Sequence, residues 1–185
     1  MEIKLKEKAS NRPVDVLSQP VKAEEKDKEG NLPRIICHDK VFHLPSFIKK
    51  IIKLLVTWHI LPADCIPNSC IINIYEAGDC IPPHVDRHDF VRPVCTVSFI
   101  NKCNIMFRTE IQIVGDGEFQ GFVEIPLPVG SILVLKGNGA DVAKHCIPGV
   151  LYPRNSITLK RMNEEKVPFR FRPDPKIEYL QPFEL

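Results

Sequence analysis

The sequence predicts a mainly β domain with one flanking helix, an α+β arrangement whose strands form a β-sandwich or jelly roll. Three observations support this fold class. One helix-like segment occurs before residue 60, short β-rich segments succeed one another from residue 69 onward, and Gly, Pro, Asn and Asp separate them. The chain of 185 residues, 44% hydrophobic and 26% charged, has the length and composition of one globular domain.

The N-terminal segment differs in composition from the rest of the chain. In residues 1–30, Lys, Glu and Asp are interspersed and apolar residues are too sparse for a core face, so we expect a charged, flexible segment. Residues 31–44 are expected to form a short strand and a loop. No apolar run resembles a signal peptide or reaches the roughly 20 residues that span a bilayer. We therefore expect an intracellular protein, in the nucleus, the cytoplasm or both, that has no membrane partner.

Charge and cysteine usage narrow the function classes further. The formal net charge is only +2, which gives no global electrostatic argument for nucleic-acid binding, although local basic patches stay open. Seven cysteines are present, an odd number without any C-x-x-C pair. This usage indicates free, mostly buried thiols in a reducing compartment rather than a disulfide framework.

Residues 45–58, P-S-F-I-K-K-I-I-K-L-L-V-T-W, predict an amphipathic helix that begins at Pro45 or Ser46. Its apolar side chains form one stripe and its lysines lie off that stripe. The stripe consists of Phe47, Ile48, Ile51, Ile52, Leu55 and Trp58. A helix on a membrane surface is the alternative. We favour a helix packed on a sheet because the run is short and a β-rich region comes directly after it.

The predicted strands are short and rich in Ile, Val, Phe and Thr. They cover residues 70–76, 94–100, 103–108, 110–114, 119–125, 131–136 and 154–161. The connections D-G-E and G-N-G-A-D are turn sequences. We place the folded domain at residues 31–165.

The C-terminal tail, residues 166–185, contains four of the 17 prolines. It therefore cannot form a long helix or a central strand. We expect it to pack over the core through Phe169, Phe171 and Tyr179, or to be partly mobile.

The segment I-P-P-H-V-D, residues 81–86, holds the first candidate functional residues. His84 and Asp86 are two positions apart, so an extended backbone points both to one face, where they can hold a divalent metal. His145, in D-V-A-K-H, offers a third ligand. Two histidines and one carboxylate form the facial triad of non-haem Fe(II) oxygenases, and no thiolate lies at a zinc-site spacing.

Two alternatives to this triad stay open. H-V-D can be a loop pair, with His145 an ordinary core histidine. His88 lies on the same alternation as His84 and Asp86 and is an alternative ligand.

A second constellation lies in R-N-S-I-T-L-K, residues 154–160. Its alternate residues carry two cations and two hydroxyls to one strand face, which is costly to bury without a partner. These residues are Arg154, Ser156, Thr158 and Lys160. A small dianion would be such a partner, since Arg clamps a carboxylate through two bonds. Asn73 and Tyr75, two apart on another strand, could bond the same dianion, or be a structural Asn and a core Tyr.

The order N-x-Y, H-x-D, H and R-x-S-x-T-x-K resembles the AlkB family of Fe(II)/2-oxoglutarate dioxygenases. Two longer segments closely resemble the plant branch of this family, which is related to mRNA N6-methyladenosine demethylases. They are C-I-P-P-H-V-D-R-H-D-F and G-N-G-A-D-V-A-K-H-C. The resemblance covers about residues 30–165.

The resemblance implies a double-stranded β-helix, a cupin-like variant of the jelly roll. It implies that His84, Asp86 and His145 bind Fe(II). It further implies that 2-oxoglutarate binds through Arg154, with the other cosubstrate-binding residues beside it. These are Asn73, Tyr75, Ser156, Thr158 and Lys160.

The implied reaction consumes O2 and 2-oxoglutarate, yields succinate and CO2, and hydroxylates an N-methyl group that then leaves as formaldehyde. The implied substrate is single-stranded RNA, above all N6-methyladenosine in mRNA, with an effect on mRNA stability and turnover. We expect the protein to act as a monomer.

Two departures from the family pattern define the alternative function. Lys160 stands where the family usually has Arg, so a point charge replaces a planar fork. Residues 1–41 contain no Phe, Tyr or Trp, whereas the family carries an aromatic lid there, and a base held without stacking loses roughly 1–3 kcal/mol. The alternative is an RNA-binding module with a degenerate, weakly active or inactive dioxygenase pocket. A metal-stabilised cupin-like structural protein is a third interpretation.

Overall fold

The computed structural model describes residues 44–121, 123–167 and 171–184. The predictions for residues 1–30, and for all of residues 31–44 except Leu44, lie outside the described residues. The domain limits at residues 31, 165 and 166 stay a prediction.

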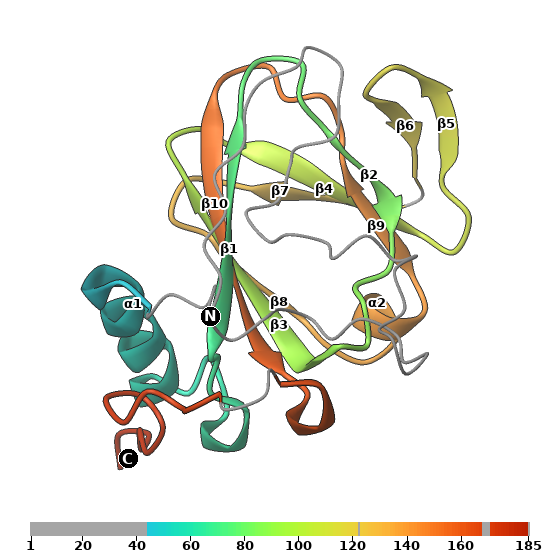
Figure 1. Cartoon of the computed structure of the whole chain (residues 1–185). Helices are drawn as coiled ribbons and strands as arrows, with labels where there is room; N and C mark the ends of the chain where they lie inside the picture. Colours follow the sequence, from blue (N-terminus) through green and yellow to red (C-terminus); the bar gives the residue numbers. More distant parts are fainter. Residues whose placement is uncertain (1–43, 122, 168–170, 185) are drawn as a thin grey trace, which may run out of the picture.

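The described chain forms two four-stranded sheets and a small hairpin (Figure 1). The first sheet contains, in spatial order, β1 (Ser69–Tyr75), β10 (Arg154–Met162), β3 (Phe90–Phe99) and β8 (Ile132–Leu135). The second contains β2 (Ile81–His84), β9 (Lys144–Ile147), β4 (Cys103–Arg108) and β7 (Val123–Leu127). The hairpin pairs β5 (Gln112–Gly115) with β6 (Glu118–Gln120). All pairings are antiparallel, so the predicted mainly β, jelly-roll fold class is confirmed.

In the described part of the chain, helical segments are few and short. They are α1 (Ser46–Thr57), the 3-10 turn η2 (Ala63–Cys65), α2 (Asn138–Asp141) and the 3-10 turn η3 (Glu164–Lys166). None of the described helices is long and apolar enough to cross a membrane.

The core between the sheets draws apolar side chains from both of them. Tyr75 of β1 packs with Ile105 of β4, Leu127 of β7 and Ile147 of β9 in one buried cluster. Because strands of both sheets contribute to this cluster, the inner faces of the two sheets are in contact and not separated by solvent.

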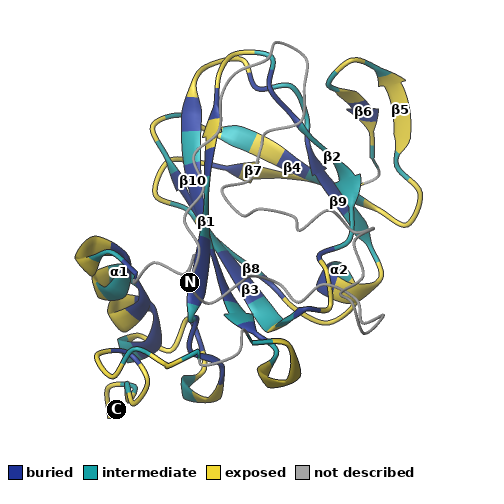
Figure 2. Cartoon of the chain, viewed as in Figure 1, coloured by how far each residue is buried: buried dark blue, intermediate teal, exposed yellow. Residues whose placement is uncertain are grey.

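Helix α1 covers the outer face of the first sheet. Ile48, Ile52 and Leu55 are buried in one cluster with Ile157 and Leu159 of β10. Figure 2 shows the buried side of α1 turned toward β1 and the exposed side turned away. The helix packed on a sheet is therefore the correct alternative.

Two members of the predicted apolar stripe were wrongly placed. Phe47 is 50% exposed and Trp58 is 63% exposed, whereas Val56, which was not in the predicted stripe, is buried. The ring of Trp58 stacks on Phe183 with centroids 6.2 Å apart, and the Phe183 amide donates to Thr57 O at 2.9 Å. The end of the helix thus contacts the C-terminal tail through Trp58, while Leu55 and Val56 of its last turn stay in the buried cluster.

The tail packs on the core, but through other residues than predicted. Ile177 is 3% exposed and joins the α1 cluster, with Leu180 against it. Tyr179 is 76% exposed, so its predicted packing role is wrong. Phe171 is partly buried, and Phe169 lies outside the described residues.

The strand predictions need three corrections. Residues 119–125 are not one strand but belong to β6 and β7, with Gly121 between them. β2 was not predicted, because Pro82 and Pro83 lack the N–H that a ladder needs. β9 and α2, four residues each, were not predicted either.

The described cysteines are free thiols, as predicted. Burial raises the pKa of Cys95 to about 12 and that of Cys70 to about 11, so both stay protonated at neutral pH.

Candidate metal centre

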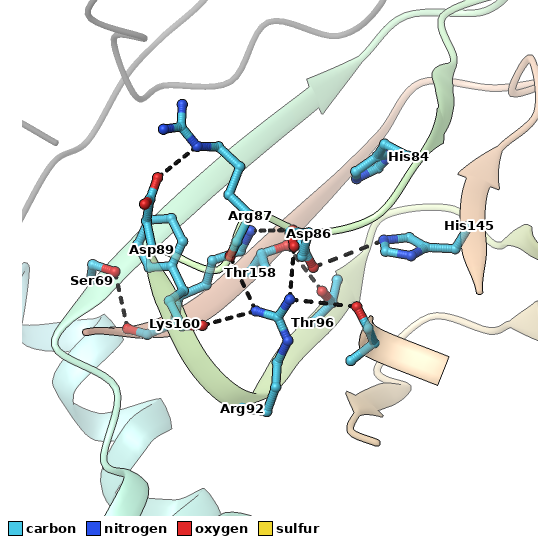
Figure 3. Close-up of polar contacts among 12 residues, drawn as sticks. Ser69, His84, Asp86, Arg87, Asp89, Arg92, Thr96, His145, Thr158 and Lys160 are labelled. Carbon is cyan, nitrogen blue, oxygen red and sulfur yellow. Dashed lines mark hydrogen bonds and ion pairs between the residues drawn. The ribbon is translucent and has the colours of Figure 1, made fainter. Parts of the chain in front are cut away.

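The ladder between β2 and β9 sets His84 directly opposite His145. Their ring centroids are 4.4 Å apart. Asp86 lies two residues beyond the end of β2, and its side chain points back toward His145 (Figure 3). One ligand atom from each of the three side chains lies within 4.8 Å of the others. The structure therefore brings the three predicted residues together at one point.

Each histidine has a ring nitrogen that can coordinate a metal. His84 Nδ1 lies 2.8 Å from the carbonyl oxygen of Pro82 and must donate its proton there, which leaves Nε2 with a free lone pair. His145 directs Nε2 at Asp86 Oδ2, 3.9 Å away. His145 Nδ1 is buried and has no hydrogen-bond partner within the described part of the chain.

His145 is neutral at physiological pH. Burial lowers its pKa to about 4, and the neighbouring His84 lowers it as well. The contact with Asp86 is therefore no ion pair at pH 7. A neutral imidazole is the form that binds a metal.

Asp86 is buried but ionised. Burial by itself raises the pKa of this carboxyl, yet the charge and hydrogen bond of Lys160 outweigh burial and lower the pKa below its ordinary value. Lys160 Nζ donates to Oδ1 at 2.5 Å, while Oδ2 is the oxygen near His145. One carboxylate oxygen is thus bonded to lysine and the other faces the histidines.

The donor set fits a first-row divalent metal of the iron type. It offers two imidazole nitrogens and one carboxylate oxygen, all partly or fully buried, and contains no thiolate. Nitrogen and oxygen donors of this kind suit Fe(II), whereas structural zinc sites favour four ligands that include cysteine.

A polar cluster lies on β1 and β10, two neighbouring strands of the first sheet. The ladder between β1 and β10 pairs Tyr75 with Arg154 and Asn73 with Ser156. Arg154 is 1% exposed, donates from Nη2 to Ser98 Oγ at 3.1 Å, and lies 4.6 Å from the centre of the Tyr75 ring. Asn73 Nδ2 donates to Ser156 Oγ at 3.3 Å.

This cluster retains unused polar atoms. Among the described residues, Arg154 Nε and Asn73 Oδ1 are buried without a hydrogen-bond partner, and no carboxylate pairs with Arg154. A buried guanidinium without a counter-ion is unfavourable. The cluster therefore suits an anionic ligand.

The other two residues predicted for this face make contacts of their own. Thr158 Oγ1 lies 3.0 Å from Thr96 Oγ1 of β3, and the ammonium of Lys160 is bonded to Asp86. Asn73, Tyr75, Arg154 and Ser156 thus form one cluster, while Lys160 reaches the metal centre. Their roles toward a ligand stay predictions.

The alternative ligand His88 does not join the centre. Its side chain is 74% exposed, and Nδ1 lies 4.0 Å from Asp141 Oδ1. Sequence reasoning missed Ser98, which bonds Arg154, and Arg92, whose guanidinium binds the segment around Asp86. An arginine inside the apolar run F-V-R-P-V was the available signal for Arg92.

Comparison with known proteins places the chain in a family. A sequence profile of the 2OG-Fe(II) oxygenase superfamily matches residues 2–172. The chain belongs to this superfamily. The family resemblance inferred from the sequence is confirmed, and the family implies Fe(II) and 2-oxoglutarate as cofactors.

Curated relatives of this chain carry RNA demethylase names. It is 52% identical over 86% of its length to RNA demethylase ALKBH9B of Arabidopsis thaliana, covering 31% of that protein. It is 30% identical over 75% of its length to RNA demethylase ALKBH10B of Arabidopsis thaliana, covering 23% of that protein. It is 30% identical over 73% of its length to RNA demethylase ALKBH5 of Xenopus tropicalis, covering 38% of that protein. The chain thus spans about a quarter to two fifths of the length of these relatives.

Proposed function

We propose that this chain catalyses the Fe(II)- and 2-oxoglutarate-dependent oxidative demethylation of RNA, with N6-methyladenosine in mRNA as the substrate. The convergence of His84, Asp86 and His145, together with the buried Arg154 that has no carboxylate partner among the described residues, is the observation that carries the proposal. The identity of 52% to a protein named RNA demethylase supports the substrate class. An effect on mRNA stability and turnover belongs to the same proposal.

In this proposal, His84, Asp86 and His145 hold Fe(II). His84 would bind through Nε2, because its Nδ1 proton is bonded to Pro82 O. His145 would also bind through Nε2, the nitrogen that faces Asp86. Lys160 holds the second oxygen of Asp86, which fixes the orientation of the carboxylate.

Arg154 would bind the far carboxylate of 2-oxoglutarate. Its Nε is the unused donor of a buried guanidinium, and a carboxylate would supply the missing counter-ion. The Tyr75 ring packs against the guanidinium, and Ser98 holds one end of it, so the donors have a fixed direction before the ligand binds.

Bound Fe(II), with 2-oxoglutarate and O2, would supply the oxidant that hydroxylates an N-methyl group, whose product breaks down to formaldehyde and the demethylated base. The chain's own residues bind and orient the reactants. The buried location of Asp86 and His145 keeps water from that side of the centre.

The test is turnover of a methylated oligonucleotide. The protein is incubated with Fe(II), 2-oxoglutarate and single-stranded RNA that carries one N6-methyladenosine, and succinate, formaldehyde and the loss of the methyl mark are measured. We expect succinate, formaldehyde and demethylated base in equal amounts, and none of them from His84→Ala. Soluble, iron-loaded protein that turns over neither 2-oxoglutarate nor RNA would contradict the proposal.

The second candidate is an RNA-binding module with an inactive or weakly active pocket. The observation that favours it is the bond between Lys160 and Asp86, which leaves one cation fewer on the cosubstrate face. RNA binding without turnover, unchanged by His84→Ala, would support this candidate. Negligible RNA affinity at physiological salt would rule it out.

A further inference from the structure

Asp86 lies outside the ladder that fixes the two histidines. β2 ends at His84, and the next ladder residue is Phe90 of β3. Sheet hydrogen bonds therefore set the distance between His84 and His145 but not the position of Asp86. Lys160 holds the Asp86 carboxylate, but another group must hold the backbone of this loop if a site of three donors is to keep its geometry, because coordination tolerates little displacement.

The guanidinium of Arg92 binds this loop through its backbone. Nη2 donates to the carbonyl oxygen of Asp86 at 2.8 Å. Nη1 donates to the carbonyl oxygens of Phe90 at 3.0 Å and Arg87 at 3.3 Å. The Arg92 side chain is only 12% exposed, and its bonds to Asp86 and Phe90 are partly buried. In Figure 3, Arg92 lies beside the loop with its bonds directed at the turn.

The same guanidinium also binds the segment that leads to His145. Nε donates to Asp141 Oδ1 at 2.9 Å, and Nη2 lies 3.5 Å from the carbonyl oxygen of Ala140. Both residues belong to the end of α2, shortly before β9. One side chain thus joins the loop of Asp86 to the helix before His145.

We propose that Arg92 is a positioning residue that sets Asp86 against His145 through these bonds, which we call the Arg92 bridge. The proposal rests on the proposed function, since it assumes that the triad holds the metal. Only arginine has donors on three nitrogens in a planar fork, so lysine cannot replace it. The bridge makes the metal centre preorganised, and it touches neither metal nor substrate.

The test measures metal affinity without turnover. Mn(II), which does not drive the reaction, is titrated into wild-type protein and into Arg92→Gln and Arg92→Lys, with binding measured by calorimetry and by the electron paramagnetic resonance of bound Mn(II). We expect both variants to bind Mn(II) about 10–100-fold more weakly, because groups that orient metal ligands contribute at that level. The lysine variant should not restore affinity.

Asp141→Ala removes the acceptor at only one end of the bridge, at a side chain that is 39% exposed, so folding should be unaffected. We expect a several-fold loss of Mn(II) affinity. If Arg92→Gln does not fold, this variant decides the question: unchanged affinity would overturn the proposal.

Arg161 provides the matched control. It makes the same kinds of bond away from the centre, from Nη1 to Ile66 O at 3.2 Å and from Nη2 to Glu164 Oε1 at 3.0 Å. Arg161→Gln and Glu164→Gln should leave Mn(II) affinity within about twofold of wild type, whatever their effect on thermal unfolding. If Arg161→Gln lost as much Mn(II) affinity as Arg92→Gln, the effect at Arg92 would be general destabilisation. That result would overturn the proposal.

The outcomes separate the two proposals. Wild-type protein that does not bind Mn(II) would contradict the metal centre itself. Wild-type protein that binds Mn(II), with Arg92→Gln and Asp141→Ala binding it equally well, would overturn the proposed role of Arg92 and leave the proposed function standing.

Discussion

Arg154 and Lys160 begin and nearly end the same strand face, yet they differ in what they contact. Both are buried, at 1% and 7% exposure. Lys160 is bonded to the carboxylate of Asp86. Arg154 contacts the Ser98 hydroxyl and the Tyr75 ring, and no carboxylate of the described residues pairs with it.

The difference shows that strand alternation determines which face a charged side chain lies on but not which partner it contacts. The face of β10 is one surface, but the loop after β2 brings a carboxylate to one end of it and not to the other. Lys160 is therefore satisfied within the protein, whereas Arg154 gains most from an anionic ligand. Substitutions at each end of the face test whether this difference is real.

Lys160→Met should cause the largest change. It leaves the Asp86 carboxylate buried without its cation, so we expect the free energy of unfolding of the metal-free protein to fall by about 3–5 kcal/mol. Urea denaturation at pH 7 in the presence of a chelator measures it.

Lys166→Met is the matched control. Lys166 pairs with Asp89 at 2.7 Å, but its side chain is 45% exposed. An exposed pair of this kind contributes about 0–1 kcal/mol. Equal losses in the two variants would show that burial does not distinguish the pairs.

Arg154→Met tests the other end of the face. We expect 2-oxoglutarate to bind about 100-fold more weakly, because the carboxylate loses a buried charged partner. The free energy of unfolding without ligand should change by less than about 1 kcal/mol, since no ion pair is broken. Calorimetric titration of 2-oxoglutarate into Mn(II)-loaded protein, with Arg161→Met as control, measures the first effect. Unchanged affinity would remove Arg154 from the cosubstrate site.

The parts of the fold that were predictable depend on local patterns. The period of apolar residues predicted α1 almost to its ends, and the β-rich segments predicted six of the strands in outline. β2 and β9 were not predicted because one contains two prolines and the other contains Lys144 and His145 in four residues. These two strands exist because they pair with each other and, for β9, with β4, which no local pattern reveals.

The candidate site divides in the same way. Spacing on a strand was enough to select His84, Asp86 and Arg154 as candidates, and the structure brings the triad together. The bond of Lys160 to Asp86 and the contacts of Arg92 depend on which loop lies over which strand. The prediction for Trp58 failed for a related reason, because its contact, Phe183, comes from the far end of the chain.

Lys160→Arg should have a smaller effect than either loss of charge. Because residue 160 contacts Asp86, a guanidinium there should keep that ion pair, and 2-oxoglutarate affinity should stay within about threefold of wild type. Calorimetric titration measures it beside the Arg154 variant. A tenfold gain in affinity would show that residue 160 binds the cosubstrate, as the sequence predicted, and that the two cations act alike.

The pH dependence of the exposed pair should give the smallest effect. Burial raises the pKa of Asp89, but the hydrogen bond from Lys166 and the charge of Arg87 outweigh it and lower the pKa below the ordinary 3.8. The unfolded state therefore takes up this proton first on acidification. The stabilisation is complete above the unfolded pKa and is lost as pH falls through the lower folded pKa.

Asp89→Asn should therefore differ from wild type by at most about 1 kcal/mol at pH 7 and by less at pH 3, since Lys166 and Arg87 are solvent-exposed. Urea denaturation at the two pH values measures the difference, in which all other carboxylates cancel. A difference that grows on acidification would mean that the pKa of Asp89 is raised, and that its partners stabilise this carboxylate less than burial destabilises it. In that case the exposed pair of Lys166 and Asp89 would not stabilise the protein at all, and it would differ from the buried pair of Lys160 and Asp86 even more than expected.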